Sequence, residues 1–319
     1  MHVDTRISAR LYTGNMVEEK KYNGISWLRM QDPSREEIDS IIREYDIPPH
    51  IADELRLPSS KQRADLYEHF VFGVFHFPLP AGDELGAGRR EIDFIVGRDF
   101  IITANYGDGD PLHDFSKLFE VNSLLEKREP GEHGGHIFFY IMKHLYHAIE
   151  KRIAALDAEL EEMEAEIFKN HEREMVRSLS EASRVALDIG KMLAHHAELL
   201  ESFIAASAEL FGVGFEPYLR SLIADYDKIR MSVSSSREFL AELRETNRTL
   251  LTSKQNETMK FFTVISFVTF PLALLVSILN IESPDNPLSG NPDKFLIIVA
   301  ITAIVSLVLF IIFKRKRWL

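Results

Sequence analysis

Two apolar runs at the C-terminal end of this sequence decide its fold. Residues 261–281 read FFTVISFVTFPLALLVSILNI and residues 295–313 read FLIIVAITAIVSLVLFIIF, and neither run contains a charged side chain. At ~1.5 Å per helical residue, each run is long enough to cross a hydrocarbon core of roughly 30 Å. The runs therefore predict a hairpin of two transmembrane helices.

The rest of the chain has the composition of a water-soluble body. Of 319 residues, 27% are charged and 45% hydrophobic, which is typical of globular proteins and excludes a transporter made of many membrane helices. The formal net charge of −12 argues against nucleic acid as a partner and favours cations. Because the chain has no Cys, disulfides and thiolate metal sites are excluded. One hairpin cannot enclose a pore, so conduction requires several copies.

Basic residues flank the two runs on one side of the membrane. Lys254 and Lys260 precede the first run, whereas the connecting loop contains Lys294 among three carboxylates. Four basic residues follow the second run: Lys314, Arg315, Lys316 and Arg317. Since Lys and Arg concentrate on the cytoplasmic side of membrane spans, we expect a multi-pass protein of the cell (inner) membrane with both termini in the cytoplasm.

The N-terminal part mixes short strands with helices. Five runs rich in Ile, Val, Phe and Tyr are bounded by Gly, Asp or Pro, as strands are: residues 7–12, 25–30, 70–77, 92–97 and 100–106. Ser34 begins a capping-box pattern that predicts a helix start. The expected fold class is an α+β cytoplasmic domain with a long helical stalk and two C-terminal transmembrane helices.

From Gly134 onward, apolar residues recur three and four positions apart, which predicts long helices. After the first, we expect a second over residues 175–211 and a third that starts at Tyr218 and runs through Pro271 into the membrane. Three regions are expected: a cytoplasmic α/β domain (residues 1–132), a helical region that includes the stalk (residues 133–258) and the transmembrane hairpin with its basic C-terminus (residues 259–319).

A stripe of mostly small or polar residues passes from the predicted stalk into the first span. Its members alternate in steps of three and four residues, as in a left-handed helix bundle: Asn256, Met259, Thr263, Ser266, Phe270, Ala273, Ser277 and Asn280. Inside a membrane, such a stripe faces either close helix packing or a water-filled path. The residues alone leave both interpretations open.

In its order of elements the chain resembles the CorA family of magnesium and cobalt channels. The local matches are residues 256–260 (NETMK), 270–272 (FPL) and 316–319 (KRWL), with residues 48–55 and 63–72 resembling the family's helix, loop and strand segment. The resemblance implies a homopentamer in which the stalk helices and first spans line a central pore. It also implies that the basic ring of Lys314, Arg315, Lys316 and Arg317 surrounds the pore exit.

The resemblance also implies a regulatory metal site and a gate. Magnesium bound between cytoplasmic domains would favour the closed state. The matching positions for its carboxylates are Asp53 and Glu54, with a partner on the stalk at Asp225 or Asp227. The matching positions for the cytoplasmic pore end are the apolar constriction of Met259 and Phe262 and the polar ring of Asn256.

One signature of the family is absent. Where the family has Gly-Met-Asn at the outer end of the first span, this chain has Asn280-Ile281-Glu282. Either Asn280 supplies a ring of carboxamides, or Glu282 supplies a ring of carboxylates. Both groups accept hydrogen bonds from a hydrated Mg²⁺, but a carboxylate ring discriminates less between divalent ions. Cation conduction is therefore expected, with weaker selectivity for magnesium.

The expected function is a homopentameric divalent cation channel or transporter, with Mg²⁺ as the transported and regulatory ion and Co²⁺ as a second ion. The expected pathway runs past Glu282, Ile281, Asn280, Ser277, Ala273 and Phe270. Two alternatives remain open: a membrane-anchored sensor or scaffold that does not conduct, and a transporter of other selectivity, such as zinc with protons. The sequence has no nucleotide-binding or nucleophile motif, so we expect no enzyme. Its histidine pairs lack a zinc-site pattern, and we interpret them as structural or solvated.

Overall fold

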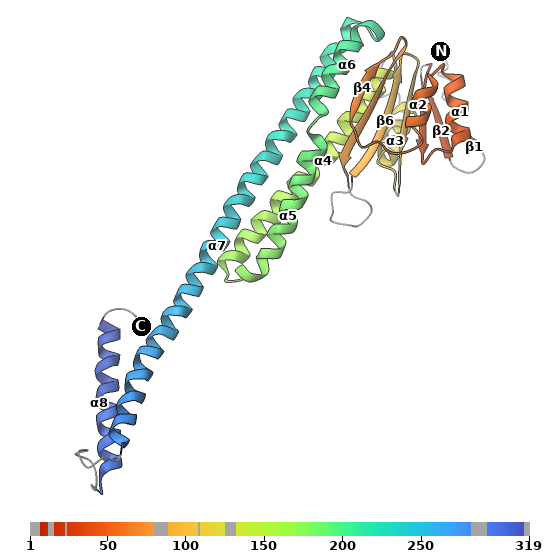
Figure 1. The fold of residues 1–319 in the computed structure, drawn as a ribbon. Helices are drawn as coiled ribbons and strands as arrows, with labels where there is room; N and C mark the ends of the chain where they lie inside the picture. Colours follow the sequence, from red (N-terminus) through yellow and green to blue (C-terminus); the bar gives the residue numbers. More distant parts are fainter. Residues whose placement is uncertain are drawn as a thin grey trace. The chain divides into compact units, whose positions relative to one another are not determined.

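A computed structural model describes residues 7–11, 16–22, 24–79, 89–107, 109–124, 132–281 and 292–315. By its internal contacts the chain divides into two units. The first comprises Met1–Lys169 and Glu174–Leu243, and the second comprises Asn170–Arg173 and Arg244–Leu319. The first unit holds the sheet, whereas the second holds the apolar hairpin (Figure 1).

A seven-stranded sheet forms the centre of the first unit. Its strands are β1 (Ile7–Leu11), β2 (Met16–Tyr22), β3 (Ile25–Gln31), β4 (Arg63–Leu66), β5 (Phe70–Pro78), β6 (Arg89–Gly97) and β7 (Phe100–Asn105). They lie in the order β1-β2-β3-β7-β6-β5-β4, with β3 and β7 parallel and the other neighbours antiparallel. The five predicted runs all form strands, whereas β2 and β4 were not predicted. β2 (MVEEKKY) and β4 (RADL) lack an apolar run, and pairing with their neighbours makes them strands.

The sheet is covered on both faces, so its central strands are buried along their whole length. On β5, Phe70 and Phe72 join a core on one face, while Phe75 and Phe77 join a core on the other, as the period of two in a strand requires. The first face is covered by α1 (Arg35–Glu44) and α2 (Pro49–Glu54). The core on the second face includes residues of α3 (His113–Leu124), α4 (Gly134–Phe168), α6 (His196–Leu210) and α7 (Glu216–Asn280), of which α4 and α6 contact the strands.

The predicted capping box is present at α1. The Ser34 hydroxyl accepts a hydrogen bond from the backbone N–H of Glu37, and the Glu37 side chain accepts one from the backbone N–H of Ser34. These two bonds satisfy backbone donors that the first helical turn leaves unpaired. The local sequence is therefore sufficient to place the start of this helix.

The prediction of one helix over residues 175–211 was wrong. The chain forms α5 (Glu172–Leu193) and α6, separated by a turn that brings His196 into the core. The Nε2–H of His196 donates to the carbonyl of His76 at 3.0 Å, and its Nδ1 accepts from the Tyr146 hydroxyl at 3.0 Å. Burial lowers the pKa of His196 to about 3, so the ring is neutral. These contacts join residues that are distant in the chain, and no helical pattern encodes them.

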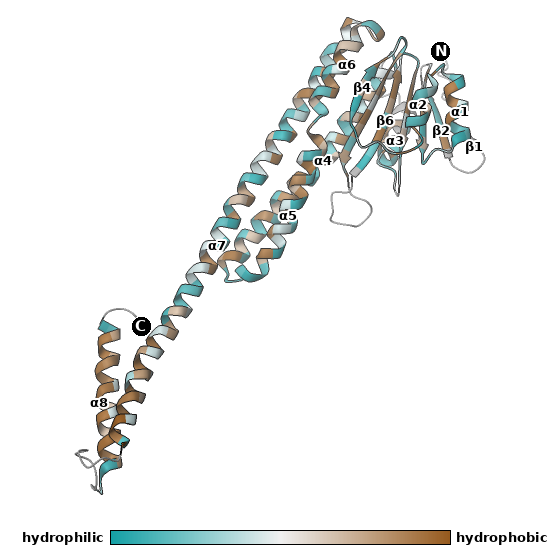
Figure 2. Ribbon diagram, in the orientation of Figure 1, coloured by the Kyte–Doolittle hydropathy of each residue, from teal (hydrophilic) through white to brown (hydrophobic). Residues whose placement is uncertain are grey.

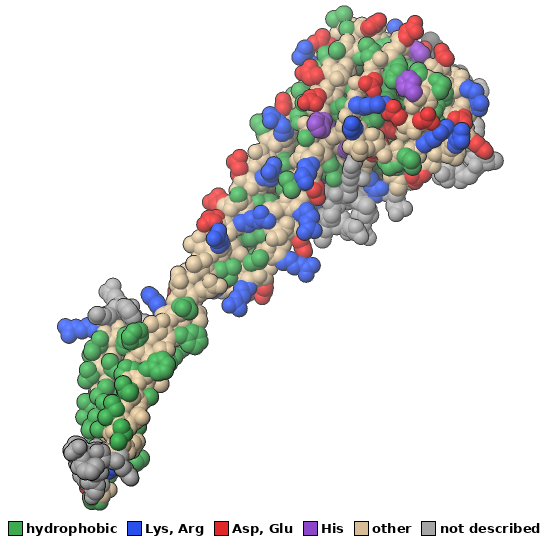
Figure 3. All heavy atoms as spheres, viewed as in Figure 1, with side chains coloured by type: hydrophobic (Ala, Val, Ile, Leu, Met, Phe, Trp, Pro, Cys, Tyr) green, Lys and Arg blue, Asp and Glu red, His purple; other side chains and the backbone are tan. Residues whose placement is uncertain are grey.

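The third predicted helix is confirmed as α7, which runs without interruption for 65 residues and contains Pro271. The last helix is α8 (Lys294–Arg315). Both are long and apolar enough to cross a membrane, and only 6% of the most apolar window of each is buried within the chain. They are therefore not core helices of a soluble body. Hydrophobic residues concentrate along α8 and the C-terminal part of α7 (Figure 2), and on the face shown in Figure 3 the charged side chains gather elsewhere.

A buried polar network attaches the end of α2 to the sheet. Asp93 Oδ2 lies 2.6 Å from the Tyr106 hydroxyl oxygen, which also lies 3.1 Å from the Leu55 carbonyl oxygen. The phenol has one proton and cannot donate to both acceptors. Both contacts are hydrogen bonds when Asp93 is protonated and donates to Tyr106, which then donates to Leu55. Burial raises the pKa of Asp93 well above its ordinary value, in agreement with this arrangement.

We predict that Asp93→Asn flattens the pH dependence of stability. Because the pKa of Asp93 is higher in the folded chain than the ~3.9 expected when unfolded, the parent loses free energy of unfolding as pH rises above about 4 toward the folded-state pKa. Asn keeps the shape and a donor for Tyr106 but cannot ionise. Thermal unfolding of the purified chain between pH 4 and pH 8 should therefore show a smaller decline for the variant.

Tyr106→Phe serves as the control for this network. It removes the bridging hydroxyl and should lower the free energy of unfolding by about 1–3 kcal/mol at both ends of the pH range. Parallel pH profiles of Asp93→Asn and the parent chain would show that Asp93 is ionised in the folded state.

Candidate ion pathway and metal site

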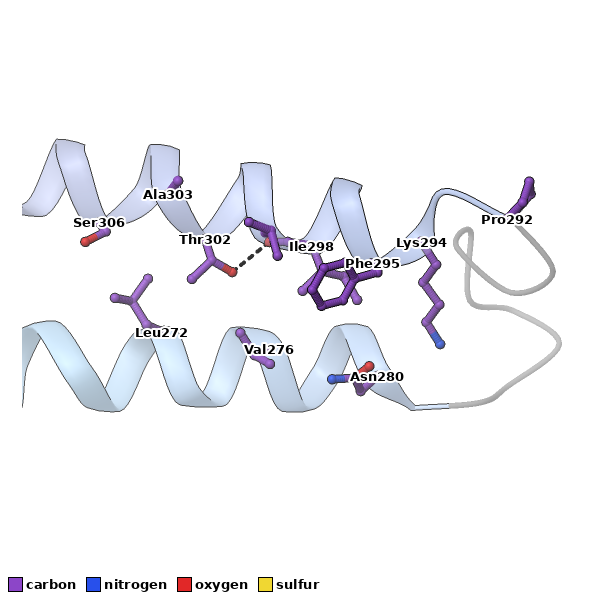
Figure 4. A pocket seen from close by; sticks show the side chains of 11 residues that line it. Leu272, Val276, Asn280, Pro292, Lys294, Phe295, Ile298, Thr302, Ala303 and Ser306 are labelled. Carbon is purple, nitrogen blue, oxygen red and sulfur yellow. Dashed lines mark hydrogen bonds between the residues drawn. The ribbon is translucent and has the colours of Figure 1, made fainter.

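One side of the first span in α7 is turned toward α8. Val264 is only 5% exposed, and Val268 and Leu272 are half-buried. Figure 4 shows Leu272 pointing from α7 toward α8, and Val276 lines the groove between the two helices. At 3.6 residues per turn, these residues share one face of the helix. The second unit therefore covers this apolar face by itself.

Most of the predicted stripe is exposed on a different side of α7, whereas Thr263 and Ser266 are half-buried and Asn280 borders the groove between α7 and α8. Met259 is 65% exposed and Phe270 is 73% exposed, and Ala273 and Ser277 are exposed as well. Seven residues separate Phe270 from Ser277, and four separate Ala273 from Ser277, so the three lie along one side of the helix. This side is available for contacts with other copies of the chain or with a water-filled path.

The candidate gate residues are also exposed. Met259 and Phe262 lie one helical turn apart, and the Phe262 ring is in edge contact with Phe261 at 6.0 Å between centroids. Phe262 is 60% exposed, and Asn256 is exposed. Since no described residue covers these side chains, a constriction made from them requires copies of α7 to face one another.

At the outer end of the span, Asn280 is the last residue of α7 and borders a groove between α7 and α8 (Figure 4). Ile281 follows and is exposed. Glu282 lies outside the described residues, as do Lys316 and Arg317. In the basic ring, Lys314 and Arg315 are exposed in the last turn of α8.

An ion pair near the start of the span was not predicted. Glu172 is buried and accepts a hydrogen bond from Lys254 at 2.6 Å, while the Asn247 side chain donates to the backbone carbonyl of Glu172 at 3.0 Å. From the sequence, Lys254 was interpreted only as a flanking charge. The partners are 82 residues apart, and no local pattern connects them.

The two carboxylates expected on the N-terminal side of the metal site are already paired with basic residues. Asp53 is 71% exposed at its side chain and lies 2.6 Å from Arg56. Glu54 is 30% exposed at its side chain and pairs with Arg63. Both residues are in α2, whose end is held by the Tyr106 network.

The two stalk carboxylates have basic neighbours as well. Asp225 Oδ2 lies 3.9 Å from the Lys143 ammonium, and Asp227 Oδ1 lies 3.4 Å from Arg230. Among the described residues, no three His, Asp or Glu side chains come together in a metal-binding group. One copy of the chain thus does not gather the predicted ligands. Mg²⁺ nevertheless keeps several of its waters and needs only one or two carboxylates, which two copies could share.

Histidine side chains pack with aromatic rings. His133 and His136 lie 4.2 Å apart between ring centroids, and His133 stacks on Phe211 at 4.7 Å. Burial lowers the pKa of His133 to about 4. Among the described residues no zinc-type cluster forms, and the contacts agree with a structural interpretation of this pair.

Comparison with known proteins adds to this geometry. The family model described as "CorA-like Mg2+ transporter protein" matches residues 22–315. The cobalt/magnesium transport protein CorA of Thermotoga maritima is 17% identical over 92% of this chain and 83% of its own length. The protein of the same name from Methanocaldococcus jannaschii is 20% identical over 92% of this chain and 91% of its own length. The complete structure of that organism's CorA magnesium transporter has a TM-score of 0.80 at 18% identity, with 98% of both chains covered.

The structural match confirms the expected fold class, an α+β domain followed by a long helix and two C-terminal apolar helices. The family model spans the chain from the end of β2 to the end of α8. Since the family consists of metal ion transporters, the expectation that the chain is not an enzyme is also confirmed. The chain belongs to the CorA-like Mg²⁺ transporter family, whose members are membrane proteins that transport divalent cations.

Proposed function

We propose that the chain forms a homopentameric channel that conducts divalent cations, Mg²⁺ first and Co²⁺ second, across the cell (inner) membrane. The observation that carries this proposal is the exposed stripe of α7, which includes Ala273 and Ser277 and lies away from the residues that face α8. Five such stripes around an axis form a continuous wall of small and polar side chains. Both relatives compared above are named cobalt/magnesium transport proteins.

In the proposed molecule, residues 1–132 form the cytoplasmic α/β domain, residues 133–258 the helical region with the stalk, and residues 259–319 the transmembrane hairpin. Both termini lie in the cytoplasm. The basic ring, Lys314 to Arg317, surrounds the cytoplasmic exit of the pore, where positive charges next to spans are favoured.

Ions enter at the end formed by Asn280, Ile281 and Glu282 and leave past Met259 and Phe262. The membrane potential supplies ~2.3 kcal/mol per charge per 100 mV, and thus about twice this for a divalent ion. Hydrated Mg²⁺ gives up its waters reluctantly. Carboxamide and hydroxyl groups along the stripe suit such an ion because they accept hydrogen bonds from its waters without replacing them.

A non-conducting scaffold is the second candidate function. The observation in its favour is the bulk of Phe270 and Phe262, which are 73% and 60% exposed on or beside the stripe. Rings at these positions in every copy narrow any central path. The same copies would then form an oligomer that anchors the cytoplasmic domain at the membrane.

We predict uptake of Mg²⁺ and Co²⁺ into proteoliposomes that contain the purified full chain. The rate should rise with an inside-negative potential, because the moving species is a cation. A dye inside the vesicles reports each metal, and a second dye reports pH. Intact pentamers without flux of any tested ion would favour the non-conducting scaffold. Zn²⁺ uptake coupled to proton movement would favour the alternative of a transporter that moves zinc with protons.

A second prediction concerns the face of α7 that lines the path. Because the chain has no Cys, Ser277→Cys and Ile278→Cys each carry a single thiol at nearly the same depth, about 100° apart around the helix. A charged, membrane-impermeant thiol reagent should modify Ser277→Cys and block most of its flux. Ile278→Cys, the matched control, should keep its flux. Equal labelling of the two positions would contradict a water-filled path along the stripe.

A third prediction concerns regulation by cytoplasmic Mg²⁺. A ligand shifts a conformational equilibrium only through different affinities for the two states, so a lost carboxylate should weaken inhibition without altering the pore. For Asp53→Asn, the inhibitory internal Mg²⁺ concentration should rise roughly fivefold or more. Glu36→Gln makes the same change of charge at an exposed position of α1 and is the control. An unchanged inhibition curve for Asp53→Asn would remove this residue from the site.

A further inference from the structure

Two contacts fasten the first turn of α5 to α7 shortly before the first span. The Lys254 ammonium of α7 donates to the Glu172 carboxylate at 2.6 Å, and the Asn247 amide of α7 donates to the Glu172 backbone carbonyl at 3.0 Å. Glu172 is the first residue of α5, and all three residues belong to the second unit. One residue of α5 is therefore bound to α7 at two positions, seven residues apart along that helix.

The pair of Glu172 and Lys254 differs from the exposed ion pairs of the chain. The Glu172 side chain is only 4% exposed, and Asn247 beside it is buried. The hydrogen bond from Lys254 lowers the pKa of Glu172, so the carboxylate is ionised at neutral pH. Loss of the Lys254 ammonium would leave a buried carboxylate without its counter-charge, which is unfavourable. The contact is therefore a firm point of attachment between the two helices.

The attached side of α7 is turned away from the candidate gate. Successive residues of a helix are about 100° apart, so Asn247 and Lys254 lie on nearly the same side. Met259 lies about 7.5 Å further along α7 than Lys254 and about 140° around its axis. Since α7 is continuous through these positions, a restraint on its movement at Lys254 also acts on the position of Met259.

We propose that Glu172 is a positioning residue for the pore, which braces α7 through Asn247 and Lys254 and holds Met259 back from the axis. This inference rests on the proposed homopentamer, in which Met259 of each copy faces the axis. In that arrangement the brace lies outside the ring of α7 helices and opposes their inward movement. The first turn of α5 thereby favours the open state of the pore.

The rate of crosslinking at the gate tests this geometry without a measurement of ion flux. Because the chain has no Cys, Met259→Cys carries a single thiol, and oxidation links neighbouring copies where the gate is narrow. Addition of Glu172→Gln should raise the crosslinking rate roughly fivefold, within the range typical of residues that couple two states. Glu181→Gln removes an exposed ion pair with Arg177 in the same helix and should leave the rate unchanged.

Mg²⁺ flux into proteoliposomes is the second measurement. Glu172→Gln and Lys254→Gln should each lower the flux severalfold in the intact oligomer. The charge exchange Glu172→Lys with Lys254→Glu should restore a large part of it, which a general loss of structure would not do. Equal crosslinking rates with and without Glu172→Gln, or no recovery on charge exchange, would overturn the brace and leave the proposed channel in place. Absence of Met259→Cys crosslinks in every background would instead contradict the proposed homopentameric gate, and the brace with it.

Discussion

The hydrocarbon core of a membrane offers no water to unpaired peptide groups, and the second unit is built under that constraint. Every backbone donor and acceptor must find a partner inside the chain, which leaves the helix as the form available to a single hairpin. α7 meets this requirement by continuing as one helix from Glu216 to Asn280. Pro271 within it has no N–H, so the carbonyl of Phe267 lacks its usual donor, a loss that membrane helices tolerate. Because α7 is continuous, it contributes its first residues to the first unit and its remaining residues to the second.

The absence of water in the hydrocarbon core also means that each polar side chain in the span needs a hydrogen-bond partner. The hydroxyls of Thr263 and Thr302 donate to carbonyls four residues earlier, at 2.7 and 2.8 Å, and are satisfied within their own helices. Ser277 and Asn280 instead bring polar atoms to exposed positions. Polar groups at such positions have a low free energy only when they meet water, an ion, a headgroup or another helix. The proposed pathway follows from this requirement.

The first unit faces the opposite problem, because each polar or charged group in its interior must be neutral or paired, as Lys20 is with Glu120. Inside, burial favours the neutral forms of both His196 and Asp93, because it lowers the pKa of the first and raises the pKa of the second. Outside, Asp53 and Asp227 form ion pairs with nearby arginines. Exposed ion pairs contribute only ~0–1 kcal/mol, so a divalent cation between two copies could replace the arginine without a large loss of stability.

The sequence by itself determined the features that depend on local chemistry. The apolar runs predicted both spans, the Ser34 capping box predicted the start of α1, and β-type runs predicted five of the seven strands. The stripe on α7 could be recognised in the sequence because helical periodicity places its members on one side of the helix, whichever element packs against that side. Asp53 as a metal ligand and Met259 as part of a gate were instead named from the resemblance to the CorA family.

Only the tertiary structure decided the features that depend on residues far apart in the chain. It showed that β2 and β4 are strands, that α5 and α6 are separate helices with His196 buried, and that Glu172 pairs with Lys254. It also showed that Phe270, Ala273 and Ser277 of the stripe are exposed, and that α7 and α8 border a groove. Periodicity fixes which side chains share a face, but the neighbour of that face is chosen by packing and by the cost of burying unpaired polar groups.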